Sequence, residues 1–207
     1  MVRKTKEEAW ETRQRILDAA EQVFQRHGVS RTSLSHIAAE AGVTRGAIYW
    51  HFKNKVDLYD AMIRRVLDPE ESPCGNGMLA MGDPLRAIRE LAVDFLRRVA
   101  LDARHQRVLE IAWHKCEYVD EMAAIRDGHL ECGRRFIALL EAAMRRAQDL
   151  GQLSTVVSPH QAAVGIMALI DGLVVNWTLE PTLFPLADYA PAVMDAYLTG
   201  LGARVES

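Results

Sequence analysis

An all-α fold is predicted for this chain of 207 residues by three observations. Apolar residues recur with a period near 3.6 in almost every segment, as they do along helices that bury one face. Capping residues precede these segments, and glycines often follow them. Residues 153–157 form the one segment that could be a strand, and a single short strand cannot build a sheet.

Four helices are expected in the first third of the chain. Gly28 stands where the first helix must end, because glycine readily adopts the left-handed conformation found there. Thr32 or Ser33 caps the second helix. Thr44 caps the third, and Asn54 caps the fourth. The expected ranges are 7–27, 33–41, 45–51 and 55–67.

A loop and a second group of helices are expected after these. Residues 68–83 contain helix breakers and acids without a period, which predicts a loop between two units. Asp83-Pro84 and Ser158-Pro159 are typical helix starts, because proline fits the first helical turn. Helices are expected at 84–101, 104–113, 121–150, 159–179 and 190–200. The sequence thus predicts a small N-terminal three-helix domain of residues 1–55 and a larger helical domain of residues 56–207.

The composition is that of an ordinary globular protein, with 49% hydrophobic residues and a net charge of −3. The longest apolar run, residues 162–170, is much shorter than the roughly 20 residues of a membrane-spanning helix. The first fifteen residues are rich in charged side chains and have no apolar core, unlike a secretory signal. Three widely spaced cysteines argue against a disulfide framework. We therefore expect a cytoplasmic protein that does not enter the membrane.

The charge is divided unevenly along the chain. Residues 1–55 carry ten lysines and arginines against six acids, so the rest of the chain has a net negative charge. A basic head on an acidic body favours a small unit that faces nucleic acid. A solvated surface would show the same excess, so the charge gains meaning only from a recognisable motif.

Residues 37–49 have the pattern of a helix-turn-helix. Two helices that cross steeply need a small residue at their contact, a residue that tolerates positive φ in the turn, and an apolar residue that locks the second helix. Ala38, Gly42 and Ile48 meet these needs in order. The alternative is an ordinary corner between two helices, and the surrounding basic and aromatic residues favour DNA binding over it.

The second helix of this motif carries the candidate base contacts. Arg45 can donate a two-pronged hydrogen bond to guanine, and Gly46 lets the backbone come close to DNA. Hydroxyl, aromatic and basic residues around the motif are expected to contact the DNA, many of them at its phosphates. These further candidate residues are Arg31, Thr32, Ser33, Thr44, Tyr49, Trp50, His51, Lys53 and Lys55.

The same region resembles the DNA-binding domain of TetR-family transcriptional repressors. The resemblance lies in residues 32–38 (TSLSHIA) and 42–58 (GVTRGAIYWHFKNKVDL), except that Val56 stands where the family usually has an acid. Weaker similarity at residues 2–24, 109–117 and 171–173 is to the multidrug-efflux repressors of the AcrR and TtgR type. The resemblance implies a homodimer, operator DNA as partner, and release of that DNA when a hydrophobic drug-like inducer binds the C-terminal domain.

The helix expected at residues 159–179 is apolar on more than one side, so it must be buried on two faces. One face can serve its own domain. The other, with residues 190–200, fits a two-fold interface of four helices between two copies. A monomer that wraps the helix completely is the alternative.

Asp171 is the one carboxylate in this apolar helix, and it must be paired, hydrogen-bonded or in contact with water. A structural hydrogen bond and a ligand contact both fit. The resemblance implies a ligand pocket in the C-terminal domain, where aliphatic and aromatic side chains would accept many ligands. The expected lining is Leu91, Phe95, Leu109, Trp113, Phe136, Leu140, Met167, Asp171 and Val174, all of which would also suit a plain core.

Catalytic and metal-binding patterns do not stand out in the sequence. His114-x-Cys116 and His129-x-x-Cys132 lack the paired cysteines of a zinc site, and a di-iron bundle would need Glu-x-x-His motifs that the chain does not contain. We therefore expect no metal, no cofactor and no enzyme activity. The alternatives are a DNA-binding regulator that ignores ligands and, more remotely, a helical-bundle metalloenzyme.

Overall fold

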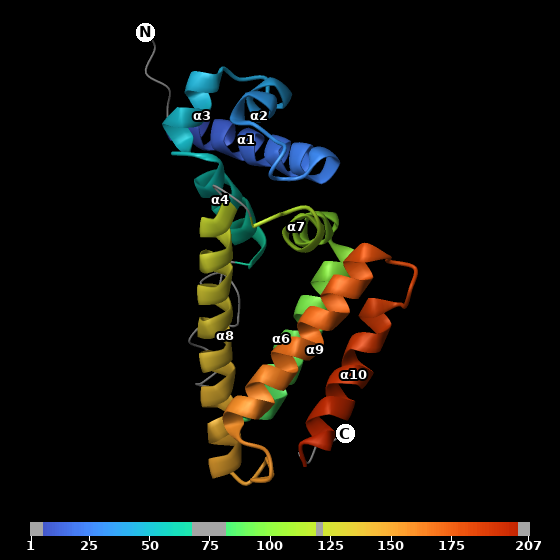
Figure 1. Ribbon diagram of the computed structural model, residues 1–207. Coiled ribbons are helices and arrows are strands. Elements are labelled where there is room, and N and C mark those ends of the chain that lie inside the picture. Colours follow the sequence, from blue (N-terminus) through green and yellow to red (C-terminus); the bar gives the residue numbers. More distant parts are fainter. Residues whose placement is uncertain (1–5, 68–81, 119–121, 203–207) are drawn as a thin grey trace. The chain divides into compact units, whose positions relative to one another are not determined.

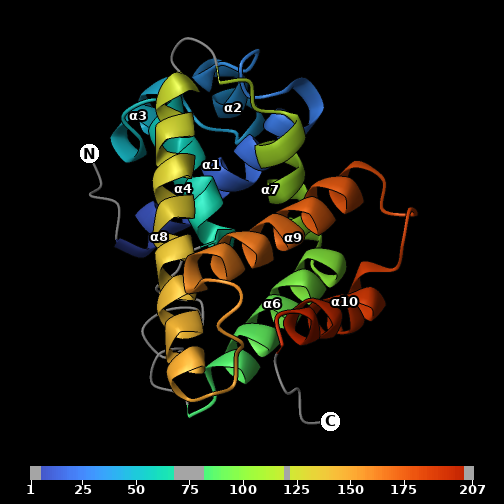
Figure 2. The same ribbon diagram turned by 60° about the horizontal axis from the view of Figure 1, so that its bottom comes forward.

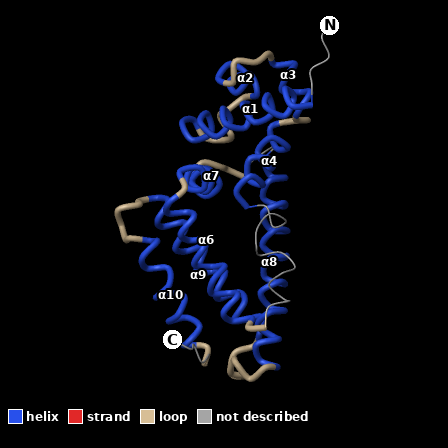
Figure 3. Tube along the Cα trace, turned by 180° about the vertical axis from the view of Figure 1, so that it is seen from behind, coloured by secondary structure: helices blue, strands red, loops and turns tan. Residues whose placement is uncertain are grey.

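The computed structural model describes residues 6–67, 82–118 and 122–202, and the regular structure in these ranges is helical (Figure 1). The predicted all-α class is confirmed. Residues 153–157 form bends in place of a strand, as the tube in Figure 3 shows by its loop colour. The helices are α1 (Lys6–His27), α2 (Leu34–Glu40), α3 (Arg45–His51), α4 (Lys55–Leu67), α6 (Pro84–Leu101), α7 (Ala103–His114), α8 (Ala123–Asp149), α9 (Pro159–Leu179) and α10 (Leu186–Gly200).

The helix ends follow the capping residues closely. Ser33 and Thr44 accept backbone N–H bonds at the starts of α2 and α3. The last helix differs most from its expected range, because it begins at Leu186 and continues through Pro191, which suggests a helix start when read alone. Most of the expected loop at 68–83, and the expected start of the helix at residue 121, lie outside the described residues.

Internal contacts divide the chain into two compact units. The first contains residues 1–67 and 107–127, and the second contains residues 68–106 and 128–207. This division differs from the boundary expected between residues 55 and 56. The reason is that α4 packs against α1 and buries its apolar face in the core of the first unit. The largest buried side chains of that core include Ile16, Phe24, Ile37, Ile48, Phe52, Leu58, Tyr59 and Met62.

The second unit is built around α6, which contacts both α9 and α10 (Figure 2). Arg89 of α6 holds Asp195 of α10 through two hydrogen bonds, of which the one from Nη2 to Oδ2 measures 2.8 Å. Tyr197 of α10 donates a hydrogen bond to the backbone oxygen of Ala162, at 2.8 Å. A Cβ atom at Gly165 would collide with the Tyr197 hydroxyl, so the Tyr197 side chain keeps this position only while residue 165 is glycine.

Helix α9 is apolar over most of its length. Its most hydrophobic 18-residue window has a mean hydropathy of 1.7, enough for a membrane span by length and composition only, and 39% of that window is buried in the monomer. The core helix of a soluble protein meets the same criterion. Here α9 packs within a helical unit and begins with a capping box formed by Ser158 and Gln161.

Candidate nucleic-acid interface

The turn between α2 and α3 has the geometry that the helix-turn-helix pattern predicts. Gly42 has a φ of +64°, a conformation that side chains beyond glycine rarely adopt. The Val43 amide donates to the Ala38 oxygen at 3.0 Å, which closes the turn. Ala38 is buried where the two helices meet. These local contacts fix the angle at which α3 leaves the turn.

One side of α3 is anchored and the other is open. Ile48 is completely buried in the core and holds the helix in place. The opposite side exposes Arg45, and Tyr49 and Trp50 have 48% and 74% of their surface accessible. Large aromatic side chains exposed together are unusual on a soluble protein and indicate a binding surface. His51 is half-buried, and its ring meets the Trp50 ring edge-on at a centroid distance of 4.8 Å.

Arg45 is oriented before any DNA is bound. Its guanidinium carbon lies 5.5 Å from the centre of the Tyr49 ring, and its Nη2 donates to the Tyr49 hydroxyl at 3.1 Å. Stacking against an aromatic ring restricts the arginine side chain and leaves further N–H groups to donate. The pair can therefore present a two-pronged donor to a guanine edge.

Gly46 leaves open the surface between these side chains. A Cβ atom added there would meet only the Thr44 hydroxyl, at 3.9 Å. The fold thus has room for a side chain at position 46. Because packing within the monomer does not require glycine there, the missing side chain points to a binding partner that approaches the backbone closely.

We expect Gly46→Ala to leave the fold intact and to stabilise α3 by about 0.5–1 kcal/mol, since alanine favours helices. DNA affinity should nevertheless fall by about tenfold or more, because the new methyl group would stand between α3 and the duplex. Gly128→Ala in α8, where an added Cβ meets nothing within 4 Å, is the matched control and should leave DNA affinity unchanged. Thermal unfolding and fluorescence anisotropy measure the two effects, and an unaltered affinity for Gly46→Ala would contradict close approach at this position.

The start of α4 is fixed by a reciprocal pair of side-chain hydrogen bonds. Asn54 accepts from the Asp57 amide at 2.8 Å, and Asp57 accepts from the Lys53 amide at 2.9 Å. Asn54 thus caps this helix, and Asp57 supplies the returning carboxylate although Val56 occupies the usual acidic position. The Lys53 side chain is exposed beside the cap, where a phosphate could reach it.

Two of the predicted phosphate contacts are structural instead. Lys55 is only 6% exposed, and its Nζ donates to the backbone oxygens of Val29, Ser30 and Thr32 at 3.0–3.2 Å. The Thr32 side chain is also buried and donates to the Gly28 oxygen at 2.7 Å. Both side chains hold the loop before α2, so their expected role in binding phosphate is corrected.

The remaining predicted residues around α2 and α3 lie at the surface. Arg31 is exposed on the loop that Lys55 holds. Ser33 and Thr44 are exposed, and their hydroxyls cap α2 and α3 by accepting from backbone amides at 3.3 and 3.2 Å. A capping hydroxyl can still donate its proton to a phosphate. These three residues stay candidate DNA contacts.

Sequence reasoning did not identify the segment that supports this loop. The Val29 amide donates to the Lys115 oxygen at 2.8 Å, and the Ser30 hydroxyl donates to the Glu117 oxygen at 3.4 Å. These bonds use backbone atoms that are 86 or 87 positions away along the chain, so no local pattern points to them. Residues 115–117 therefore belong to the framework of the candidate interface.

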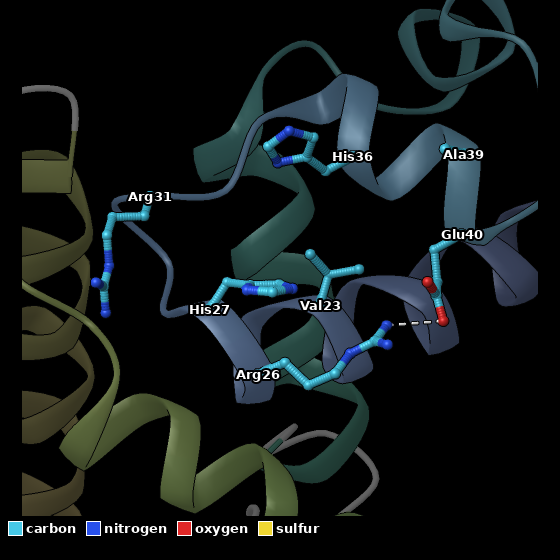
Figure 4. Close-up of a pocket in the computed structure, with 7 residues that line it drawn as sticks. All are labelled: Val23, Arg26, His27, Arg31, His36, Ala39 and Glu40. Atoms are coloured by element: carbon cyan, nitrogen blue, oxygen red, sulfur yellow. Dashed lines mark ion pairs between the residues drawn. The ribbon is translucent and has the colours of Figure 1, made fainter.

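An open groove of about 660 Å³ lies on the first unit beside α1 and α2 (Figure 4). Its lining is mainly polar and ionisable, and Arg26 is neutralised by an ion pair of 2.8 Å with Glu40. This groove differs from the apolar pocket expected in the C-terminal domain. Its lining residues are Val23, Arg26, His27, Arg31, His36, Ala39 and Glu40.

The residues expected to line the ligand pocket divide between the two units. Leu109 and Trp113 belong to the first, and the other seven belong to the second. Leu109, Leu140 and Val174 are buried, whereas Trp113 is 38% exposed. Leu91, Phe95, Phe136, Met167 and Asp171 are half-buried. The pocket stays a prediction.

Asp171 lies half-buried in α9, and the described residues provide it with no hydrogen bond or ion pair. Loss of water around the carboxyl raises its pKa from 3.8 to about 6. The charged form is therefore tolerated at neutral pH at some cost in stability, which fits a side chain in contact with water or a ligand.

We expect Asp171→Asn to raise the free energy of unfolding at pH 7.5 by about 1–2 kcal/mol, a value reduced for partial exposure. Between pH 3.8 and 6 the Asp171 carboxyl is mostly protonated in the folded protein and mostly ionised in the unfolded chain, because folding raises its pKa. The cost of burying its charge is therefore complete only above pH 6. The advantage of asparagine should therefore be complete above pH 6 and shrink as the pH falls toward 3.8. Urea unfolding of both proteins at pH 7.5 and pH 4.5 measures this, and an equal difference at both pH values would contradict the burial of the charge.

Comparison with known proteins agrees with this geometry. Residues 16–62 match the bacterial regulatory proteins of the tetR family, and residues 83–202 match the C-terminal region of MAATS-type transcriptional repressors. The chain is 42% identical over 186 residues to the HTH-type transcriptional regulator TtgR of Pseudomonas putida, and the match covers 87% of each protein.

Solved structures show the same fold over more than 90% of the chain. NalD, the secondary repressor of the MexAB-OprM multidrug efflux pump in Pseudomonas aeruginosa, has a TM-score of 0.87 and 34% identity, covering 97% of this chain and 100% of NalD. A SmeT–triclosan complex has a TM-score of 0.80 and 31% identity, covering 92% and 91%. SmeT is the repressor of the Stenotrophomonas maltophilia multidrug efflux pump SmeDEF. The helix-turn-helix, the helical second unit and these matches together place the chain in the TetR family of bacterial transcriptional regulators, with the C-terminal region of the MAATS-type repressors.

Proposed function

We propose that this protein is a ligand-responsive repressor of a multidrug efflux operon, and that it acts on operator DNA in the cytoplasm. The observation that carries the DNA-binding part is the open side of α3, where Arg45, Tyr49 and Trp50 are exposed on a helix locked by Ile48. The efflux operon is inferred from relatives such as NalD and SmeT, which repress multidrug efflux pumps.

A homodimer would place two copies of α3 on one operator. Recognition helices about 34 Å apart fit successive major grooves on one side of the duplex. The second unit offers an apolar surface for such a dimer, because Val164 and Leu179 of α9 and Tyr189 of α10 are exposed in the single chain. Pairing two copies of α9 and α10 would cover this surface.

The inducer is inferred to be a hydrophobic small molecule. SmeT was solved in complex with triclosan. Triclosan combines chlorinated aromatic rings with one hydroxyl group. In this chain, half-buried Phe95, Phe136 and Met167 of the second unit could pack against such rings. Asp171, which is half-buried and without a described partner, could accept a hydrogen bond from a ligand hydroxyl.

Release of DNA by a ligand tests the proposal directly. A labelled duplex is first selected from a random pool by the wild-type protein, and its dissociation is then followed by anisotropy as triclosan is added. Coupling of this kind is typically 5- to 150-fold in DNA affinity, and the duplex must weaken triclosan binding by the same factor. Sedimentation of the complex should show two chains on one duplex.

Two outcomes would contradict the proposal. If the affinity for the duplex is the same without ligand and with triclosan or any of a panel of hydrophobic dyes and antibiotics, the protein is a ligand-independent regulator. A protein that does not select any duplex from the pool in low salt would not be a DNA-binding regulator of the proposed kind.

A further inference from the structure

A buried carboxylate joins three segments of the first unit. Glu21 of α1 is completely buried, and each of its oxygens faces a different arginine. Arg107 of α7 donates from Nη1 to Oε2 at 3.1 Å, and Nη1 of Arg65 of α4 lies 3.5 Å from Oε1. Arg65 also donates to Asp18 of α1 at 2.6 Å. We call Glu21, Arg65 and Arg107 the buried triad.

The buried triad resists the independent movement of its three segments. A carboxylate without water is stable only while its cationic partners stay close, so withdrawal of either arginine leaves a buried charge poorly compensated. The exposed pair of Arg26 and Glu40 in the same unit differs, because water can solvate both charges when they separate. Positions of α4 and α7 relative to α1 are therefore linked through Glu21.

The segment that carries Arg107 also supports the loop before α2. Arg107 begins the segment 107–127, where the chain enters the first unit from the second. Further along this segment, the Lys115 oxygen accepts from the Val29 amide, and Gln25 of α1 donates to Glu110 at 2.8 Å. A displacement of the segment would thus act on α1 and on the loop that positions α2.

We propose that Glu21 is a positioning residue that couples changes in position of the helix-turn-helix to those of segment 107–127. This role rests on the proposed function, a DNA-binding protein that responds to a ligand. In this role the buried triad makes α4 and α7 respond together when DNA binds.

Hydrogen exchange with and without the selected duplex measures the coupling without any inducer. In the wild type, saturating duplex should slow exchange in α2 and α3 by direct contact, and in residues 107–118 by about fivefold through the buried triad. In Glu21→Gln, the protection of α2 and α3 should persist. The exchange rates of residues 107–118 with and without the duplex should then differ by less than about twofold. Arg107→Lys keeps the charge and should retain the effect.

Controls separate transmission from loss of structure. Glu40→Gln removes the carboxylate of the exposed pair in the same way and should behave as the wild type. If Glu21→Gln does not fold, Arg107→Gln replaces it, because Arg107 is only partly buried. The inference is overturned if residues 107–118 of the wild type do not respond to the duplex, or if they respond equally in the triad variants. Failure of triclosan to release DNA would contradict the proposed function and leave this result standing.

Discussion

Replacing Lys55 by methionine should lower the free energy of unfolding of the first unit by about 3 kcal/mol, the loss expected when a buried charged donor is removed. Methionine fills a similar volume but leaves three backbone oxygens, those of Val29, Ser30 and Thr32, without the ammonium group that holds them. The expected fall in melting temperature is roughly 6–12 °C for a chain of this size. Thermal and urea unfolding followed by circular dichroism measure it.

Lys53→Met is the matched control, because this lysine has the same charge and lies two positions earlier with its side chain exposed. Its substitution should leave stability within about 0.5 kcal/mol of the wild type. DNA affinity should fall, and the slope of log affinity against log salt concentration should decrease by about one for each lost phosphate contact. Equal stability of the two variants would show that the carbonyl contacts of Lys55 contribute little to the folded state.

Arg45→Ala should relax base preference at one position of each half-site by about 1–3 kcal/mol, equivalent to roughly 5- to 150-fold in affinity. The reason is that Arg45 is held against Tyr49 with donors left for a guanine edge. Affinity measurements on duplexes that carry each base at each position would locate the lost preference.

Arg64→Ala serves as the control for charge, because Arg64 is exposed in the last turn of α4. Arg64→Ala should lower affinity only slightly, and by the same factor for all duplexes, because it removes one positive charge that attracts DNA phosphates regardless of sequence. If Arg45→Ala also weakened all duplexes alike, Arg45 would be a phosphate contact and the base contact would have to come from another residue of α3.

Local chemistry explains why the helix-turn-helix could be predicted. Ala38, Gly42 and Ile48 are required by the crossing of two neighbouring helices, and their spacing is visible within a dozen residues. Helix ends could be predicted for the same reason, since Ser33 and Thr44 cap with backbone amides three positions away.

The roles of the lysines could not be predicted in this way. Lys53 and Lys55 have the same chemistry and nearly the same place in the sequence, yet one is exposed and the other is buried. The difference arises because the loop before α2 folds back over the start of α4 and presents the carbonyl groups of Val29, Ser30 and Thr32 to Lys55. Sequence reading assigned both lysines to phosphate because charge alone favours the surface.

The sequence by itself therefore determined the helical class, the positions of most helices and the family, because these follow from residues that interact over a few positions. Tertiary structure alone decided that Lys55 supports the loop before α2 and that Glu21 meets Arg65 and Arg107. Those partners lie 23–86 positions apart, and only the path of the folded chain brings such side chains together and removes the water that would otherwise solvate them.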